Sequence, residues 1–289
     1  MALIDTVAGR VLGGRDGETA QGVVSRTLSR IASGWLGLVV PLAILVVWQT
    51  LSILEVFRAT LVPPPAAVLR EVVDLARDGT LWDHIGITFQ RVFFGFFWGV
   101  LAATVLGALT GESRLARRLL DPTIQALKAV PSLAWVPLFI LWFGIFEESK
   151  ITLIAVGVFF PIYLNLMTAI RQTDRRLVEV ARINGLSSFQ TVRYFLLPGT
   201  LPSYVTGLRA GLALGWMFVI AAELMGASEG LGFLMIDGQM TGRPALIIAS
   251  LILFALSGQI TDKALGWASA PFLRWQDNLE TLEEGQRDA

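Results

Sequence analysis

Charged residues are absent or nearly absent from six long stretches of this sequence. A helix that crosses the hydrocarbon core of a membrane needs about 20 mostly apolar residues, because each residue advances it by about 1.5 Å through about 30 Å. A soluble protein can bury one helix of this kind, but six of them favour a membrane protein. The pattern therefore predicts an all-α membrane protein with six transmembrane helices, at residues 31–54, 92–111, 129–146, 151–170, 202–226 and 244–261.

Two ionisable residues, Arg209 and Glu223, interrupt the fifth stretch. Such a side chain is costly inside a membrane and normally faces a cavity or a partner of opposite charge. Glu223 therefore has two interpretations: a residue of a pore or gate, or one member of an ion pair or hydrogen bond near the outer end of the helix. Arg209 is interpreted as an anchor whose long side chain reaches the cytoplasmic interface.

The positive charges lie unevenly in the connections between these stretches. Cytoplasmic connections of membrane proteins are rich in Lys and Arg. If the N-terminus is placed inside, the cytoplasmic segments hold most of the 23 bases, and the outer segments hold only Arg58, Arg70, Arg77, Arg91, Lys150 and Arg243. This asymmetry predicts that both termini are cytoplasmic, with tails over 1–34 and 267–289, a transmembrane domain over 35–266 and a cytoplasmic loop over 171–201.

A run of three prolines, Pro63 to Pro65, separates the first two predicted spans. Proline cannot donate a backbone hydrogen bond inside a helix, but it suits the first helical position. Pro65 is therefore expected to open a new helix with one apolar face, which would lie on the outer surface of the membrane. The residues of that face are Val68, Leu69, Val72, Val73 and Ala76.

Glycines and tryptophans inside the predicted spans indicate how the helices pack. Glycines recur every four residues in two spans, a spacing that lets helix backbones approach closely in lipid. They are Gly95, Gly99, Gly107, Gly111, Gly207, Gly211 and Gly215. Ordinary packing inside the chain is the more common use of this spacing, and a dedicated dimer contact is the alternative. Trp135 and Trp216 are candidates either for lining a pathway through the membrane or for anchoring at an interface.

The composition is that of a membrane protein, and it argues against several kinds of metal site and catalytic site. Charged residues make up 16% of the chain, whereas a typical soluble domain has about 25%. The formal net charge is zero, which gives no indication of a nucleic-acid partner. With no cysteine and one histidine, His84, the sequence offers no Cys-ligated metal site and little of the His, Asp or Ser cluster that an intramembrane enzyme would need.

The cytoplasmic loop over 171–201 has the pattern of two short helices joined at a corner. Gly185 suits the left-handed position that ends a helix, and Ser187 is a good N-cap for the next one. Pro198 is expected to break the second helix just before the fifth span. Every third residue of that helix is apolar, which predicts a narrow ridge of Leu186, Phe189, Val192 and Phe195.

The spacing in this loop resembles a known signature. The sequence has Glu179-Val180-Ala181, three residues, Gly185, nine residues, Phe195, one residue and Leu197-Pro198. This is similar to the EAA loop of permease subunits of binding-protein-dependent ABC importers: Glu-Ala-Ala, three residues, Gly, nine residues, an apolar residue, any residue, Leu-Pro. Val180 and Phe195 depart mildly from that pattern. The position of the loop, between the fourth and fifth predicted spans, agrees with it.

Further segments extend the resemblance from about residue 35 to 275. Leu61-Val-Pro-Pro-Pro, Ala129-Val-Pro-Ser-Leu-Ala-Trp135-Val-Pro, Leu141-Trp-Phe-Gly-Ile and Ala221-Ala-Glu223-Leu with Gly230-Leu-Gly232 resemble permeases for aliphatic sulfonates, taurine, nitrate and bicarbonate. Phe160-Pro-Ile-Tyr163 and Gly185-Leu-Ser187 are most similar to the aliphatic-sulfonate members.

The resemblance implies a type I ABC importer permease fold in a bacterial inner membrane. Two permease copies would form the pore as a homodimer, with two ATPase subunits below and a periplasmic substrate-binding protein above. ATP and Mg would be bound by the ATPase, since this chain has no Gly-Lys-Ser/Thr phosphate loop, and the chain itself would hold no cofactor, no metal and no catalytic residue. The residues expected to couple to the ATPase are Glu179, Ala181, Gly185, Leu186, Phe189 and Pro198, and those expected in the substrate pathway are Trp135, Trp216 and Glu223.

The sequence leaves two alternatives to an aliphatic-sulfonate importer open. The same mechanism would serve taurine, nitrate, bicarbonate or another small solute in place of an aliphatic sulfonate. A secondary transporter or channel is the alternative of a different class, but it would need intramembrane charges for ion coupling and has no use for the loop signature.

Overall fold

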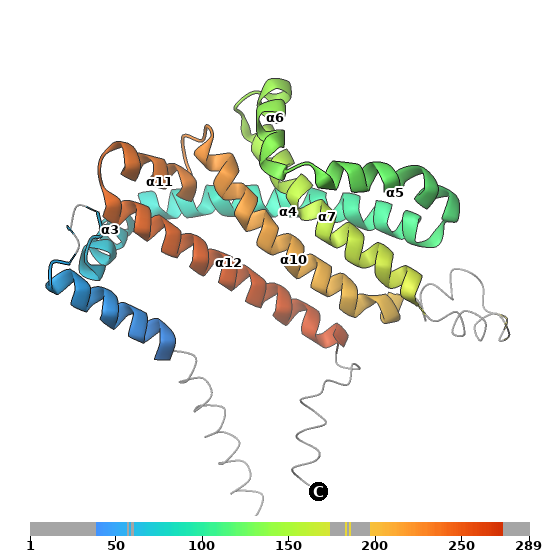
Figure 1. Cartoon of the computed structure of the whole chain (residues 1–289), viewed down its shortest axis with the longest axis horizontal. Helices are drawn as coiled ribbons and strands as arrows, with labels where there is room; N and C mark the ends of the chain where they lie inside the picture. The colour runs from blue at the N-terminus through green and yellow to red at the C-terminus, as the bar shows by residue number, and fades with distance from the viewer. Residues whose placement is uncertain are drawn as a thin grey trace, which may run out of the picture. The chain divides into compact units, whose positions relative to one another are not determined.

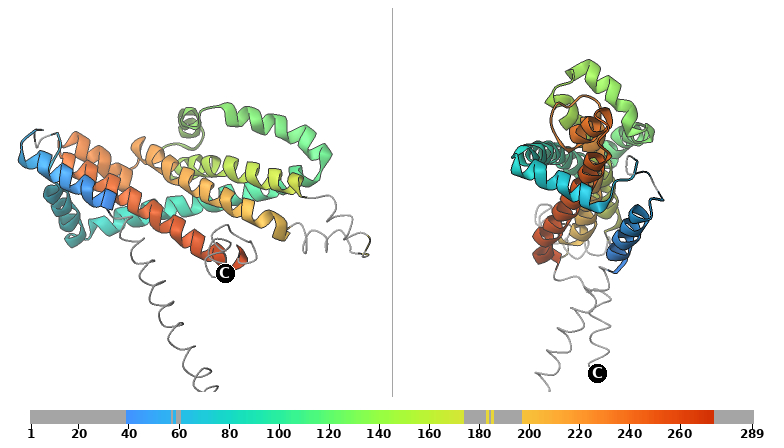
Figure 2. Two further views of the ribbon diagram at one scale, coloured as in Figure 1. Left: turned by 60° about the horizontal axis from the view of Figure 1, so that its bottom comes forward. Right: turned by 90° about the vertical axis from the view of Figure 1, so that its left-hand side faces the viewer.

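The computed structural model describes residues 39–56, 58, 61–173, 183, 185 and 197–273 (Figures 1 and 2). Within these ranges every regular element is a helix, which confirms the all-α prediction for this part of the chain. The chain divides into two compact units, Met1–Ala67 and Val68–Ala289.

The described part of the first unit contains one short apolar helix, Val39–Ile53. The indole Nε1 of Trp48 donates a hydrogen bond of 3.1 Å to the carbonyl oxygen of Pro63, so the proline run is tied back to this helix. Helix α3 (Pro65–Arg77) begins at Pro65, as predicted from the sequence. Only part of the predicted span over 31–54 falls within the described residues.

Four helices of the second unit are long and apolar enough to cross a membrane: α4 (Thr80–Glu112), α7 (Glu147–Gln172), α10 (Leu197–Leu224) and α12 (Pro244–Leu273). They contain the predicted second, fourth, fifth and sixth spans, apart from the last residues of the fifth. All four are longer than predicted, α4 and α12 by the most. α4 starts well before Arg91, so that residue lies inside a helix and not in a connection, and α12 continues past the predicted start of the C-terminal tail at 267. The predicted spans were bounded by charged residues. A helix can continue past a charged residue when that residue pairs with one of opposite charge, as Arg91 does.

The third predicted span, 129–146, is wrong as a single helix. Helix α5 (Arg114–Ala129) ends where the span was expected to begin, and the turn η1 (Ser132–Trp135) and helix α6 (Val136–Phe143) follow it. Proline disfavours a helical conformation in the residue before it, and Val130, which precedes Pro131, has ψ 124°. The helices on either side of this break are bent by 90°, as in a broken span or a re-entrant loop. The described residues therefore provide four candidate spans, or five if the bent pair is one, and the count of six is not confirmed.

Helix α7 packs against both α4 and α10, and the glycines that recur every four residues in those two helices face it. A Cβ atom on Gly99 of α4 would lie 2.7 Å from the carbonyl oxygen of Ala155. A Cβ on Gly211 of α10 would lie 2.8 Å from Cδ1 of Ile162. The interpretation of the four-residue glycine spacing as packing within the chain is therefore confirmed for the described helices.

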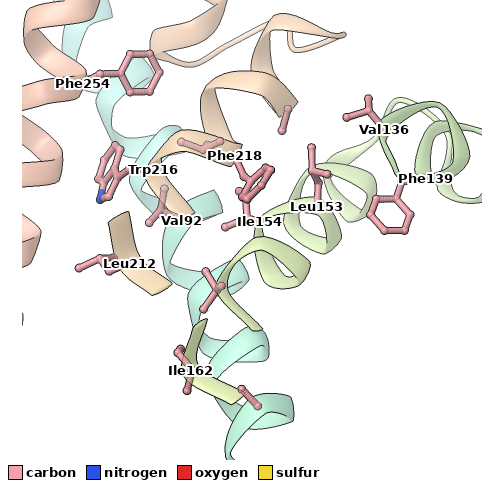
Figure 3. Packing of buried hydrophobic residues seen from close by; sticks show 14 of the residues in the cluster. Val92, Val136, Phe139, Leu153, Ile154, Ile162, Leu212, Trp216, Phe218 and Phe254 are labelled. Carbon is pink, nitrogen blue, oxygen red and sulfur yellow. The ribbon is translucent and has the colours of Figure 1, made fainter. Parts of the chain in front are cut away.

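The hydrophobic core follows the same seam. Ile154, Val158 and Ile162 are fully buried along α7. Figure 3 shows Ile154 with Val92 from α4 and Phe218 from α10, and all three belong to one buried cluster. In a membrane, such packing contributes van der Waals contact and not the hydrophobic effect, so the close fit between helices determines their association.

We expect Gly99→Ala to lower the unfolding midpoint of the purified protein. The added methyl would meet backbone of α7, and forcing extra volume into a packed site typically costs about 1–3 kcal/mol. Gly86→Ala, in the same helix but with open space around the added atom, is the matched control and is expected to be neutral or slightly stabilising. Thermal unfolding of both variants in one detergent compares them, and equal shifts would contradict the packing argument.

Candidate functional site

Glu223, near the end of α10, is fully buried and bound from three directions. Its Oε1 accepts hydrogen bonds of 2.8 Å from Nη1 of Arg91 and 2.8 Å from Oγ1 of Thr88, both on α4. Its Oε2 accepts a 2.7 Å bond from the backbone N–H of Gly232. Of the two interpretations of Glu223, the structure shows the ion pair.

The first N–H groups of helix α11 (Leu231–Met240) bind to side chains of other helices. A helix leaves its first N–H groups without partners inside the helix, and these groups carry partial positive charge. Nδ1 of His84 accepts from Gly230, Oγ1 of Thr88 accepts from Leu231, and Glu223 accepts from Gly232. The start of α11 is thereby held against α4 and α10 through three consecutive backbone groups.

Two glycines make this close approach possible. Gly230 has φ 117°, a value that L side chains rarely adopt, and a Cβ there would lie 2.5 Å from Oε1 of Glu223. A Cβ on Gly232 would lie 2.6 Å from Cβ of Glu223. The Gly-Leu-Gly sequence that follows Glu223 along the chain is therefore explained by the space that the buried carboxylate needs.

Arg91 connects Glu223 to a second acidic residue at the start of α7. Its Nε and Nη2 donate to the two carboxylate oxygens of Glu147 at 2.6 and 2.7 Å, and its Nη1 also donates to the carbonyl oxygen of Glu229 at 2.7 Å. Lys150 pairs with Glu147 at 3.0 Å. Arg91, Glu223, Glu147 and Lys150 are here called the buried charge cluster, of which Glu147, 46% exposed, is the outermost member. The cluster has two positive and two negative members and joins α4, α7 and α10.

A second ion pair, near the middle of α10, joins that helix to α12. Nε and Nη2 of Arg209 donate to the two carboxylate oxygens of Asp262 at 2.8 and 2.5 Å. Arg209 thus lies near the middle of α10 and pairs with a neighbouring helix, which replaces its interpretation as a lone anchor at a helix end. Beside it, the indole N–H of buried Trp216 donates to Oγ1 of Thr261 at 2.8 Å.

The structure does not bring the three predicted pathway residues together on an open face. Trp216 and Glu223 are buried among α4, α10 and their neighbours. Trp135 lies on η1, where its ring stacks on Phe139 at 6.0 Å and its buried Nε1 has no hydrogen-bond partner among the described residues. A role of these residues in a substrate pathway stays a prediction.

Most of the predicted coupling loop lies outside the described residues, including Glu179, Ala181, Leu186 and Phe189. Gly185 is described, and its φ of 72° confirms the left-handed conformation predicted at the corner of the loop. Pro198 lies in the first turn of α10, where a proline is tolerated.

The family of binding-protein-dependent transport system inner membrane components matches residues 95–266, a range that holds α7, α10, most of α4 and most of α12. The chain belongs to this family. The aliphatic sulfonates transport permease proteins SsuC of Bacillus subtilis (strain 168) and Escherichia coli (strain K12) are 38% and 39% identical to this permease, over 86% and 87% of its chain and 90% and 94% of theirs.

A further relative is the taurine transport system permease protein TauC of Escherichia coli (strain K12), which is 31% identical over 82% of this permease and 88% of its own length. Among solved structures, a chain of the inward-facing MetNI methionine ABC transporter has 22% identity and a TM-score of 0.49, and the match covers 66% of this permease and 95% of that chain.

Sequence reasoning missed Arg91 as a partner of Glu223 in this permease. It placed Arg91 in an outer connection because a charge there ended an apolar stretch. A signal was available in the spacing: a helix extended back to Thr80 would put Thr88 and Arg91 three residues apart, on one face. What the sequence did not show is that α10 and α11 deliver Glu223 and Gly232 to that face.

Removing one member of the buried charge cluster is expected to destabilise the permease strongly. Glu223→Gln removes the fully buried counter-charge of Arg91 and leaves it paired with the half-exposed Glu147. Breaking a fully buried pair typically costs about 3–5 kcal/mol. Glu71→Gln is the matched control, because it removes a half-exposed pair with Arg243, for which about 0–1 kcal/mol is typical. Thermal unfolding in lipid nanodiscs measures both, and a Glu223→Gln variant as stable as Glu71→Gln would contradict a structural role for the cluster.

Proposed function

We propose that this permease forms the membrane pathway of an ATP-driven importer for a small anion, an aliphatic sulfonate. The observation that carries the proposal is the similarity to two aliphatic sulfonates permeases over about nine-tenths of their length. Taurine is the second candidate, supported by the lower identity to the taurine permease. Nitrate and bicarbonate follow only from the resemblance of the sequence segments.

The importer would consist of two copies of this permease, two ATPase subunits and a periplasmic substrate-binding protein. Membership of the binding-protein-dependent family supports the binding protein, and the absence of a phosphate-binding loop from the sequence supports an ATPase on a separate chain. Six spans, a type I importer fold and cytoplasmic termini complete the proposal. The uneven distribution of Lys and Arg supports that orientation.

The loop over 171–201 would transmit ATPase motion to the pore. Its ends are the C-terminus of α7 and the N-terminus of α10, the two helices that pack together through Gly207 and Gly211. A push on the loop would therefore act directly on two helices that pack closely against each other. The left-handed Gly185 supports a sharp corner in the loop, which would present its second helix to the ATPase.

ATP-dependent uptake by the reconstituted complex tests the substrate. Proteoliposomes that hold the permease and its ATPase, with the binding protein outside, are expected to accumulate labelled ethanesulfonate in preference to taurine, nitrate and bicarbonate. Omitting ATP or the binding protein is the control and should abolish uptake. Preference for taurine would move the assignment to the second candidate, and uptake driven by an ion gradient without ATP would indicate a secondary transporter.

Substitution of Gly185 tests the coupling loop. A β-branched residue in a left-handed conformation is strained by roughly 1–2 kcal/mol. No atom of the described residues lies within 4 Å of a Cβ placed on Gly185, so among them the strain comes from the backbone and not from a collision. Gly185→Val is therefore expected to insert and assemble normally but to lose several-fold in both ATPase stimulation and uptake. Gly185→Asn, which tolerates the same conformation, is the matched control and should retain more of both. Equal activity of the two variants would contradict the proposed corner.

A further inference from the structure

The exposed face of α4 and the exposed middle part of α10 differ in the character of their side chains. The exposed side chains that recur along α4 are large and apolar: Phe93, Phe97, Leu101, Val105 and Leu109. Those in the middle of α10, between residues 203 and 213, are small or polar: Ser203, Thr206, Arg209, Ala210 and Ala213. The exposed large apolar side chains of α10, which are Leu197, Met217 and Leu224, lie nearer its two ends. A face of large apolar side chains suits lipid, whereas a face with a charged residue between small ones suits water or another protein surface.

The charged residue of this α10 face is only partly covered. The side chains of Arg209 and Asp262 are 52% and 31% exposed, in contrast to the 3% and 0% of Arg91 and Glu223. Asp262 occupies Nε and Nη2 of the guanidinium, and in the described part of the chain Nη1 donates to no protein atom. A guanidinium has five N–H donors, so one edge of Arg209 is available for a further acceptor.

The packing of α10 on α7 fixes the depth of Arg209. Gly207 and Gly211, on either side of it, both lie against Ile162 of α7. Ile162 is about 12 Å along the helix from Ile170, the end of the charge-free stretch of α7, at about 1.5 Å per residue. The Arg209–Asp262 pair therefore lies well inside the membrane-spanning part, where a half-exposed charged pair against lipid is costly. This face must meet water or protein.

We propose that Arg209 is the anion-binding residue of the translocation pathway, with the free Nη1 edge of its guanidinium as the contact for a sulfonate group. This inference rests on the proposed function, since it takes the importer's substrate to be a small oxyanion. A guanidinium matches two oxygens of such a group with two parallel hydrogen bonds. Asp262 orients the guanidinium so that this edge is turned away from α12.

Asp262 also sets the strength of the contact. It neutralises Arg209 when no substrate is present and repels the arriving anion when one is bound. Binding is therefore weak, as a pathway requires, because a substrate that binds tightly does not leave. The fully satisfied buried charge cluster offers no such site, since Nε, Nη1 and Nη2 of Arg91 all donate to protein acceptors.

Uptake by variants of the reconstituted importer tests this assignment. Arg209→Gln is expected to lower ethanesulfonate uptake by at least about tenfold, since a hydrogen bond to a charged group is worth that much or more. Its ATPase stimulation by loaded binding protein should persist, because assembly and coupling do not depend on the anion contact. Asp262→Asn keeps the cation and should keep more uptake than Arg209→Gln. Arg243→Gln, which removes an ion pair of similar exposure from the start of α12, is the matched control.

The outcomes separate three cases. No sulfonate uptake by the unmodified importer would overturn the proposed function. Normal uptake by the unmodified importer and by Arg209→Gln would overturn this inference alone. Equal loss in Arg209→Gln and Asp262→Asn, with recovery in the double variant, would show that the pair is structural and would overturn it as well.

The reactivity of an introduced cysteine tests the same assignment without replacing Arg209. The chain has no native cysteine, so Thr206→Cys introduces a single thiol one turn from Arg209. A water-soluble thiosulfonate reagent is expected to modify it, and ethanesulfonate should slow the reaction. Val105→Cys on the apolar face of α4, where the native side chain is 57% exposed, is the control and should stay unreactive. An unreactive Thr206→Cys would place this face against lipid or a second copy and would overturn the inference.

Discussion

Helix α7 approaches α4 and α10 so closely that a single methyl group on Gly99 or Gly211 would collide with it. In lipid, helices gain little from burying apolar surface against each other, so close contact between backbones supplies much of what holds them together. The glycines on both sides of α7 therefore fix how far apart the three helices lie. The buried charge cluster, which joins these three helices, depends on that spacing.

The buried charge cluster lies at the start of α7, near the end of α10 and within α4. Arg91 on α4, Glu147 on α7 and Glu223 on α10 come within hydrogen-bond distance only because their helices are already side by side. Each charge then finds an opposite charge and several donors or acceptors, which is the condition for tolerating charges in a low-dielectric interior. Helix α11 is attached to this cluster through its N-terminal backbone groups, so the short helix and the long ones form one unit.

The two ion pairs of α10, Glu223 with Arg91 and Arg209 with Asp262, have different roles. Glu223 has every oxygen engaged and no exposed surface, which makes it part of the scaffold. Arg209 has a free edge and an exposed face, which leaves it able to bind something else. A membrane protein can place a charge inside its spans at low cost in either way, by full satisfaction within the protein or by contact with water.

The sequence by itself determined the all-α class, four of the long helices, the helix start at Pro65, the left-handed Gly185 and the family. These follow from local properties: apolar length, the missing N–H of proline, the absent side chain of glycine and the spacing of a short signature. Tertiary structure alone decided that Glu223 pairs with Arg91, that Arg209 pairs with Asp262, and that α4 and α12 continue past the charges expected to end them. The break at Pro131 was readable in the sequence, but the 90° bend between α5 and the helical turns that follow it, at the start of the predicted third span, was not. A charged residue does not have to end a membrane-spanning helix when a residue of opposite charge pairs with it inside the protein. The pairs found here join residues more than 50 positions apart, which only the packing of the helices brings together.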